Sequence, residues 1–208
     1  MIVEAGGYVA LPLSLSEVGT SRAQAEKGRL LVDAMIRHES FFTDYERACD
    51  EHCGKCERCL LAGTLAIGAL SDPKSICWEV WSREQDTGLL LDFAGILRLS
   101  NVRRGCYADA HYFFFDGRLP DKTPLLEAWR EWAFSDSPGW QGLERVTTEI
   151  PTFAYALARH AVKRLGFGGS YTYSHKGTVI PVEGVKRHAV RWHDQWWDVL
   201  VMGALRGN

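Results

Sequence analysis

One segment, residues 143–167, constrains the fold of this chain more than any other. Residues 146–150 are rich in β-branched side chains, which favour a strand, and Pro151 ends that strand because proline cannot donate to a sheet ladder. From Thr152, a usable N-cap, apolar residues recur at helical spacing as far as Gly166, which is placed to end the helix. The segment therefore predicts a strand followed directly by an amphipathic helix, a unit from which α/β binding sites are built.

The rest of the chain also alternates between strand and helix patterns. Residues 75–84 and 89–102 predict an antiparallel pair of strands, and residues 108–116 predict a long central strand. Thr123–Phe134 predicts a helix that opens on a threonine N-cap with proline at its first position. The remaining expected elements are a first strand in 6–16, a helix in 22–37, and two last strands in 168–182 and 191–206.

A strand that stops near a possible catalytic carboxylate, followed by a helix that ends in Leu165-Gly166-Phe167, resembles the C-terminal half of the GNAT family of N-acetyltransferases. The resemblance extends over the whole chain. It implies one α/β (α+β) domain over residues 1–208, with a mostly antiparallel central sheet of about seven strands flanked by about four helices. It also implies acetyl-CoA as cofactor. The stretches 109–122 and 196–206 further resemble divergent GNAT-like proteins that bacteriophages encode.

Composition and charge narrow the possible partners. With 46% hydrophobic residues, 208 residues can bury the core of one domain. A net charge of -2 argues against a nucleic-acid partner held by phosphate neutralisation. The most apolar run, 89–97, is interrupted by Asp92, and the N-terminus lacks the pattern of a secretory signal, so we expect neither membrane insertion nor secretion. The expected location is cytoplasmic, with a virion as the alternative.

Four of the six cysteines, Cys49, Cys53, Cys56 and Cys59, form a C-x3-C-x2-C-x2-C cluster. In a reducing cytosol, such closely spaced thiols suggest a zinc or iron–sulfur site, because thiolates are the ligands that both select. The same spacing also places all four cysteines on one face of a helix, where they would form a small apolar stripe. Both interpretations predict a cysteine-rich helical insertion at about 45–62.

Cofactor binding in the GNAT family depends on a glycine-containing loop before the helix that follows the central strand. Aligned on Arg118, this chain has Asp121 and Thr123 where the family has small residues. An acidic side chain facing a pyrophosphate is repulsive, whereas Arg118 and Lys122 could compensate. The resemblance therefore implies Arg118, Lys122 and Thr123 as cofactor-binding candidates in a loop that departs from the family pattern.

The helix after the carboxylate-bearing strand carries the remaining cofactor and acid candidates. In the family, an asparagine early in this helix and a tyrosine late in it often contact the cofactor. Here those places hold Tyr155 and Val162. Tyr155 remains a cofactor-binding candidate, and His160, two residues from the second place, is a substitute for the acid that protonates the leaving thiolate.

Glu149 is the best candidate for the general base, because it stands at the strand end where an amine would enter. An ordinary exposed strand carboxylate is the alternative interpretation. Asp109 and His111 share a face of the central strand, so a carboxylate–imidazole pair is also open.

Two functional classes follow from these residues. The first is an N-acetyltransferase that acts on a primary amine of a small molecule or peptide. The second is an inactive GNAT-like docking protein, such as a virion component stapled by its cysteines. Eight tryptophans in 208 residues exceed the needs of one small core, so an interface with another copy or with a virion protein is plausible.

Overall fold

The computed structural model describes residues 1–13, 29–33, 55–84, 86–115, 122–175 and 177–207. Three candidate site residues, Cys49, Cys53 and Arg118, lie outside these ranges. Most of the helix predicted in 22–37 also lies outside them, and its described part, 29–33, is helical.

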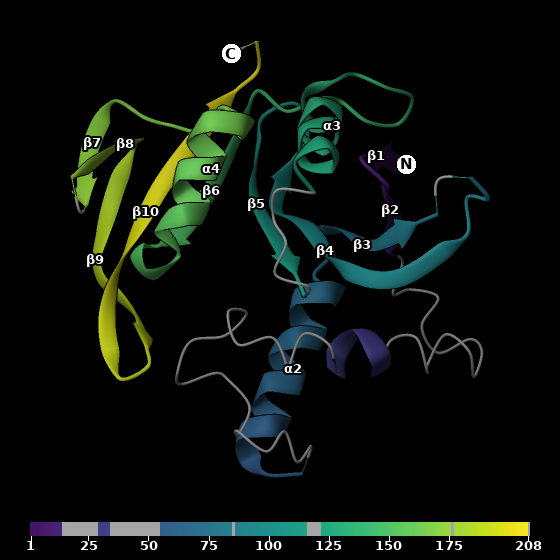
Figure 1. Cartoon of the computed structure of the whole chain (residues 1–208), viewed down its shortest axis with the longest axis horizontal. Coiled ribbons are helices and arrows are strands. Elements are labelled where there is room, and N and C mark those ends of the chain that lie inside the picture. The colour runs from purple at the N-terminus through teal and green to yellow at the C-terminus, as the bar shows by residue number, and fades with distance from the viewer. Residues whose placement is uncertain (14–28, 34–54, 85, 116–121, 176, 208) are drawn as a thin grey trace.

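One large sheet organises the molecule (Figure 1), with strand order β1-β2-β3-β4-β5-β6-β10-β9. The bounds of its strands are β1 Val3–Ala5, β2 Tyr8–Leu13, β3 Ile76–Arg83, β4 Leu90–Arg103, β5 Tyr107–Phe114, β6 Arg145–Pro151, β9 Gly184–Trp192 and β10 Gln195–Leu205. Its neighbouring strands pair antiparallel, except that β5 and β6 run parallel. This mixed, mostly antiparallel sheet confirms the predicted fold class, with eight strands rather than about seven.

Three strands were not predicted from the sequence: β1 lies before the segment 6–16, β9 lies mostly before the segment 191–206, and the segment 168–182 forms two strands rather than one. In the first segment, Gly6 and Gly7 both adopt positive φ, which turns the chain back and separates β1 from β2. In 168–182, Gly177 has a φ of 76° and lies between β7 (Tyr171–His175) and β8 (Thr178–Val182), which pair only with each other. The prediction of one strand there was wrong, because this glycine provides a left-handed turn residue.

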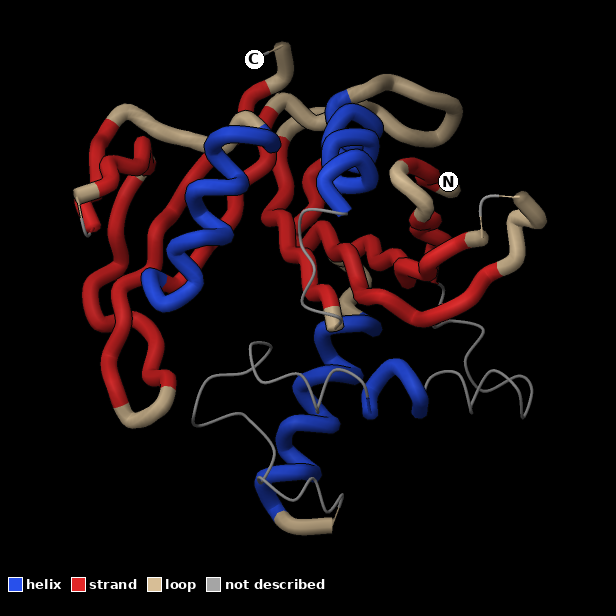
Figure 2. The backbone as a smooth tube through the Cα atoms, viewed as in Figure 1, coloured by secondary structure: helices blue, strands red, loops and turns tan. Residues whose placement is uncertain are grey.

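In the described part of the chain, residues 29–33 are helical, and three longer helices flank the sheet: α2 (Glu57–Ser71), α3 (Thr123–Phe134) and α4 (Tyr155–Leu165). In Figure 2, α3 and α4 lie side by side in front of the sheet, and α2 extends away below it. Side chains of a strand alternate between the two faces of the sheet, so one strand contributes to two separate clusters. Leu97 and Leu99 of β4 belong to the cluster beneath α3 and α4, whereas Ile96 belongs to the cluster with α2.

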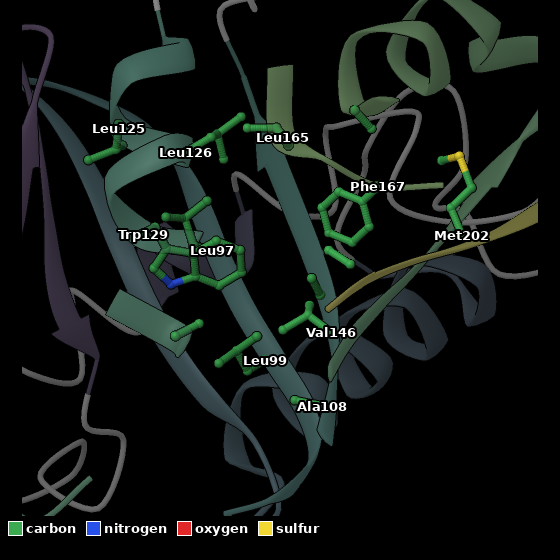
Figure 3. Packing of buried hydrophobic residues seen from close by; sticks show 14 of the residues in the cluster. Leu97, Leu99, Ala108, Leu125, Leu126, Trp129, Val146, Leu165, Phe167 and Met202 are labelled. Atoms are coloured by element: carbon green, nitrogen blue, oxygen red, sulfur yellow. The ribbon is translucent and has the colours of Figure 1, made fainter. Parts of the chain in front are cut away.

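The main core joins α3 and α4 to the middle strands (Figure 3). Trp129 of α3 is only 4% exposed and meets Trp78 of β3 edge to face, with the ring centroids 5.8 Å apart. Trp132 contacts the same Trp78 at 4.9 Å and stacks on Trp140 at 4.8 Å. Four of the eight tryptophans, those at positions 78, 129, 132 and 140, therefore pack against one another between α3 and β3. This packing makes them part of the core rather than a partner surface.

The end of α4 agrees with the sequence prediction, but its beginning does not. Gly166 has a φ of 67° and donates its backbone N–H to the carbonyl of Ala161, as expected for a helix-ending glycine. Thr152, predicted to be the N-cap, instead opens a short 3-10 turn, Thr152–Ala154. Its hydroxyl donates to the carbonyl of Asp198 at 3.1 Å, so it ties the strand-to-helix connection to β10.

The described part of the cysteine cluster lies at the start of α2. Cys56 is the N-cap residue in an extended conformation, and Cys59 is buried within the first turn against the sheet. One continuous helix therefore does not pass through Cys56, which weakens the interpretation as a helical stripe. Among the described residues, no three His, Cys, Asp or Glu side chains gather as a metal site would require.

No helix within the described ranges is long and apolar enough to cross a membrane.

Candidate active site

The parallel strands β5 and β6 separate after a short paired stretch. Their register runs only from Tyr107 opposite Arg145 to Asp109 opposite Thr147. One residue further along, the hydroxyl of Thr148 donates to the carbonyl of Ala110 at 3.1 Å. Beyond this contact the two strands enclose a cavity of about 130 Å³. It is lined by residues 110–113 of β5, by residues 148–151 of β6, and by Phe153, Ala154 and Leu157 at the start of α4.

Backbone polar groups of β5 face this cleft. A strand residue directs its N–H and C=O to the same side, and that side alternates along the strand. The Ala110 carbonyl lies on the β6 side, where it accepts from Thr148. The N–H and C=O of Tyr112, two residues further, therefore point into the gap where β6 no longer pairs with β5. Such groups can bind an extended ligand, as a third strand would.

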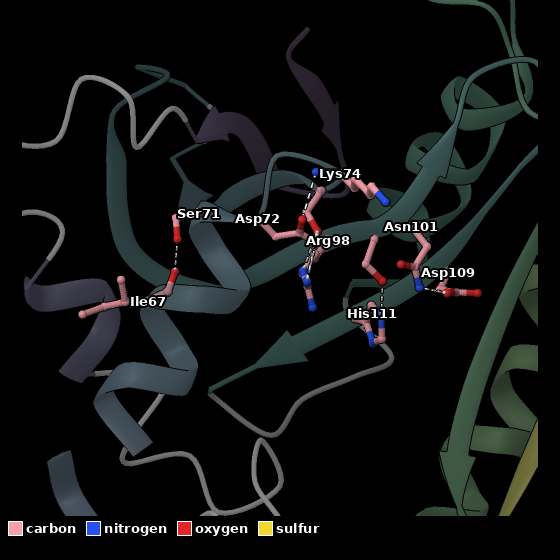
Figure 4. Close-up of polar contacts among 10 residues, drawn as sticks. Ile67, Ser71, Asp72, Lys74, Arg98, Asn101, Asp109 and His111 are labelled. Carbon is pink, nitrogen blue, oxygen red and sulfur yellow. Dashed lines mark hydrogen bonds and ion pairs between the residues drawn. The ribbon is translucent and has the colours of Figure 1, made fainter. Parts of the chain in front are cut away.

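His111 stands on the α2 side of the cleft. Its Nε2 lies 2.8 Å from the hydroxyl of Ser100 on β4 (Figure 4). Burial lowers the pKa of His111, and the charge of Arg98 lowers it further, while Asp109 and Glu149 act in the opposite direction. The imidazole is therefore neutral at pH 7, which is the form that can accept a proton.

Asp109 shares the His111 face, but the structure gives it other hydrogen-bond partners. Its carboxylate accepts from the amide of Asn101 at 2.6 Å and from the hydroxyl of Thr147 (Figure 4 shows the first contact). Ser100, rather than Asp109, contacts the imidazole. The carboxylate–imidazole pair considered from the sequence is therefore not formed directly, and Asp109 acts on His111 only through its charge.

Glu149 lies at the mouth of the cleft, where the sequence placed the general base. Its carboxylate pairs with the ammonium of Lys186 on β9, and both side chains are about half exposed. An ion pair this exposed is worth about 0–1 kcal/mol, so an incoming substrate can displace Lys186 at little cost.

His160 and Thr123 meet at the junction of the two helices. Thr123 is the first residue of α3, and its hydroxyl lies 3.3 Å from Nε2 of His160 on α4. Burial lowers the pKa of His160, with a smaller contribution in the same direction from Arg164 and an opposing one from Glu127. His160 therefore lies against the N-terminus of α3, and neither Thr123 nor His160 is part of the described lining of the cleft.

Lys122 and Tyr155 have partners within the protein. Lys122 is fully buried, and its ammonium lies 5.2 Å from the ring centroids of both Tyr8 and Phe114. Tyr155 directs its hydroxyl away from the cleft, where it donates to the carbonyl of Thr178 at 2.7 Å. These contacts favour structural roles for both side chains over the predicted contact with a cofactor.

Sequence reasoning missed Tyr112 as a functional candidate. Tyr112 lines the cleft, and its buried hydroxyl has no hydrogen-bond partner in the described part of the chain. Burial raises the pKa of this hydroxyl, so it remains a neutral donor at physiological pH. An unsatisfied buried donor of this kind costs about 1–3 kcal/mol. The period-two pattern of β5 was the signal that could have separated Tyr112 from its neighbours.

No family model and no curated protein matches this sequence. Solved structures do match. A GNAT-family acetyltransferase from Bacillus anthracis aligns over 100% of both chains at 8% identity and a TM-score of 0.58. Spermidine N-acetyltransferase from Vibrio cholerae, solved with CoA and spermine, aligns over 97% of both chains at 13% identity and a TM-score of 0.56. A GNAT-family protein from Chromobacterium violaceum aligns over 99% of this chain and 86% of its own, at 16% identity and a TM-score of 0.57. This chain therefore has the fold of the GNAT acetyltransferases.

Proposed function

We propose that this protein is an acetyl-CoA-dependent N-acetyltransferase that acts on a primary amine. The observation that carries the proposal is the open parallel pair, β5 and β6, which leaves a cavity of about 130 Å³ lined by strand backbone. A neutral imidazole and a carboxylate also line this cavity. Bound acetyl-CoA would supply the acetyl group as a thioester.

The residues of the cleft suit the acyl group of acetyl-CoA better than they suit its phosphate groups. The N–H of Tyr112 faces the gap. It can donate to a thioester carbonyl and to the negative charge that develops on it during attack. At the N-terminus of α3, Thr123 remains to meet phosphate groups, because Lys122 is held between two rings.

The acceptor amine would approach from the side of His111 and Glu149. Glu149 is exposed enough to attract an ammonium group in place of Lys186. His111 accepts the proton that the ammonium group must lose before its nitrogen can attack, and the contact with Ser100 fixes the orientation of the ring. His160 stays the candidate for returning a proton to the departing thiolate. In this division of roles, Glu149 binds the amine and His111 is the base.

Calorimetric titration with acetyl-CoA tests the proposal first, with micromolar binding expected. Release of free thiol from acetyl-CoA should then be measured with a panel of primary amines, including spermidine, spermine and a lysine peptide. The matched variants are His111→Gln, which removes the base, and His175→Gln on the separate hairpin, which should leave the rate unchanged. Absence of acetyl-CoA binding at high micromolar concentration contradicts the enzyme.

The second candidate is a GNAT-fold docking protein without activity. The observation in its favour is the burial of Lys122 and the engagement of Tyr155, since two of the four predicted cofactor contacts are occupied by protein groups. Such a protein would neither bind acetyl-CoA nor release thiol, so the same titration separates the two candidates. Virion proteins or a second copy of the chain remain its proposed partners.

The cysteine cluster stays a candidate zinc or iron–sulfur centre in either case. Cys56 precedes α2 in extended conformation and Cys59 lies three residues later, a spacing that zinc sites use. Elemental analysis and a visible spectrum identify the metal, because iron–sulfur centres absorb visible light and zinc does not. If metal is bound, Cys53→Ser with Cys56→Ser should abolish it and lower the melting temperature. Metal-free protein contradicts the centre.

A further inference from the structure

A second, larger cavity lies beyond α4, away from the candidate active site. Its volume is about 560 Å³, within the range of small-molecule sites. In Figure 1 the hairpin of β7 and β8 lies on the side of α4 that faces away from α3. The cavity is lined by Thr152 and Phe153 of the connection to α4, Tyr155 and Arg159 of α4, His175 and Thr178 of the hairpin, and Trp197 of β10.

The walls of this cavity are held in place without a ligand. The hydroxyl of Tyr155 donates to the carbonyl of Thr178, and its ring packs against His175 with the centroids 4.8 Å apart. Phe153 stacks on Trp192 at 5.2 Å and meets Trp197 edge to face at 5.9 Å. A cavity whose aromatic walls are already fixed binds a ligand with little additional loss of conformational entropy.

The charge of this cavity is positive. Arg159 is exposed and has no carboxylate partner in the described part of the chain. None of the described lining residues is acidic. The nearest acid on β10, Asp198, is occupied, because it pairs with Arg187 and accepts the backbone N–H of His188. The guanidinium of Arg159 repels a cationic ligand and attracts an anionic one, so the charge of the lining favours an anion.

We propose that this cavity binds a planar ring that carries an anionic group. The ring would lie against Trp197, Phe153 and Tyr155, and a carboxylate or phosphate on it would pair with the guanidinium of Arg159, which can bind either group through two hydrogen bonds. The hydroxyl of Thr152 is already used by Asp198, so the charge recognition rests on Arg159. The proposal does not depend on acetyl transfer, because the binding groups lie on α4, the hairpin and β10.

Calorimetry on the full chain without acetyl-CoA tests this proposal with matched pairs of ligands. Indole-3-acetate is compared with the neutral indole-3-ethanol, and adenosine monophosphate with adenosine. We expect at least one anion to bind with submillimolar affinity and at least tenfold more tightly than its neutral counterpart. The carboxylate and phosphate arms identify which anionic group is preferred. Equal affinity within both pairs, or no binding of any of the four at millimolar concentration, overturns the proposal.

Variants of α4 assign the binding to the cavity. Arg159→Gln should lower the affinity for the preferred anion at least tenfold and leave the affinity for its neutral counterpart unchanged. Lys163→Gln is the matched control, because Lys163 is exposed on the same helix but is not part of the described lining. Saturating acetyl-CoA should not displace the anion. An unchanged affinity in Arg159→Gln, an equal loss in Lys163→Gln, or displacement by acetyl-CoA each overturns a separate anion site here.

Discussion

The two cavities at the start of α4 are built in different ways, although Phe153 lines both. The cleft between β5 and β6 comes from topology, because two parallel strands that stop pairing expose backbone groups between them. The cavity beyond α4 comes from side chains, since aromatic rings and one arginine line the space next to the hairpin of β7 and β8. Substitutions should therefore affect the two independently: a cleft made of backbone depends on the sheet, whereas a cavity made of rings depends on how the hairpin is held.

The largest effect is expected from His111→Gln in the cleft. Loss of a general base typically lowers a rate by about 10²–10⁴-fold, so thiol release should fall at least a hundredfold. Calorimetry should show unchanged affinity for acetyl-CoA and for the anion that binds beyond α4. A rate within threefold of the unmodified protein would remove His111 from the proposed chemistry and leave Glu149 as the base.

Gly169→Ala should damage the hairpin but not the cleft. A Cβ at Gly169 would lie 2.1–2.2 Å from backbone atoms of Val182 and Glu183, so β8 must move. Overpacking of this kind costs about 1–3 kcal/mol, and denaturant unfolding measures it. Gly184→Ala is the control, because a Cβ there meets nothing within 4 Å. The anion affinity should fall with the stability of Gly169→Ala, and if both remain unchanged, the hairpin does not depend on this close contact.

Tyr155→Phe tests the contact between α4 and the hairpin with a smaller expected loss of stability. Removing the hydroxyl deletes one hydrogen bond to the Thr178 carbonyl, which should cost about 1 kcal/mol of unfolding free energy. Thiol release should be unchanged, because Tyr155 is directed away from the cleft. A large loss of acetyl-CoA affinity in this variant would instead restore Tyr155 as the cofactor contact expected from the family resemblance.

A smaller loss of folding stability is expected at acid pH. His111 has a lowered pKa in the folded protein, so below the ordinary value of 6.5 the unfolded chain binds a proton that the folded chain does not. Its contribution to stability is therefore complete above about pH 6.5 and is lost as pH falls below it. His160 acts in the same direction. Urea unfolding at pH 5.5 and 7.5 measures the loss, and His111→Gln should reduce the difference. An identical difference in the variant assigns the pH dependence elsewhere.

The sequence predictions were accurate where local interactions determine the structure, and they failed where residues distant in sequence interact. The bounds Thr123–Phe134 were predicted to the residue, because the early proline and the apolar spacing are local signals. Gly166 ended α4 for a similarly local reason. The predicted N-cap of α3 was wrong: Lys122 is the N-cap, and Thr123 is already the first helical residue. Thr152 departed from its predicted role because a carbonyl of β10, distant in sequence, competed for its hydroxyl. The hairpin at Gly177 was missed because β-branched residues continue on both sides of the turn.

The same division applies to the candidate site. Sequence alone identified Glu149 as a carboxylate at a strand end and placed Asp109 and His111 on one face, because side chains alternate along a strand. It could not find the cleft, since the gap exists only where β5 and β6 stop pairing, and pairing joins residues 38 positions apart. Nor could it tell that Lys122 is enclosed by Tyr8 and Phe114.

Local propensity and spacing therefore determined which elements this chain forms and the fold that they compose. Tertiary structure alone decided which polar groups remain available to a ligand. Arg159 has a guanidinium without an ion-pair partner in the described part of the chain, whereas the hydroxyl of Tyr155 is engaged by the carbonyl of Thr178. The physical reason is that the availability of a side chain depends on the partners that long-range packing brings to it or withholds from it.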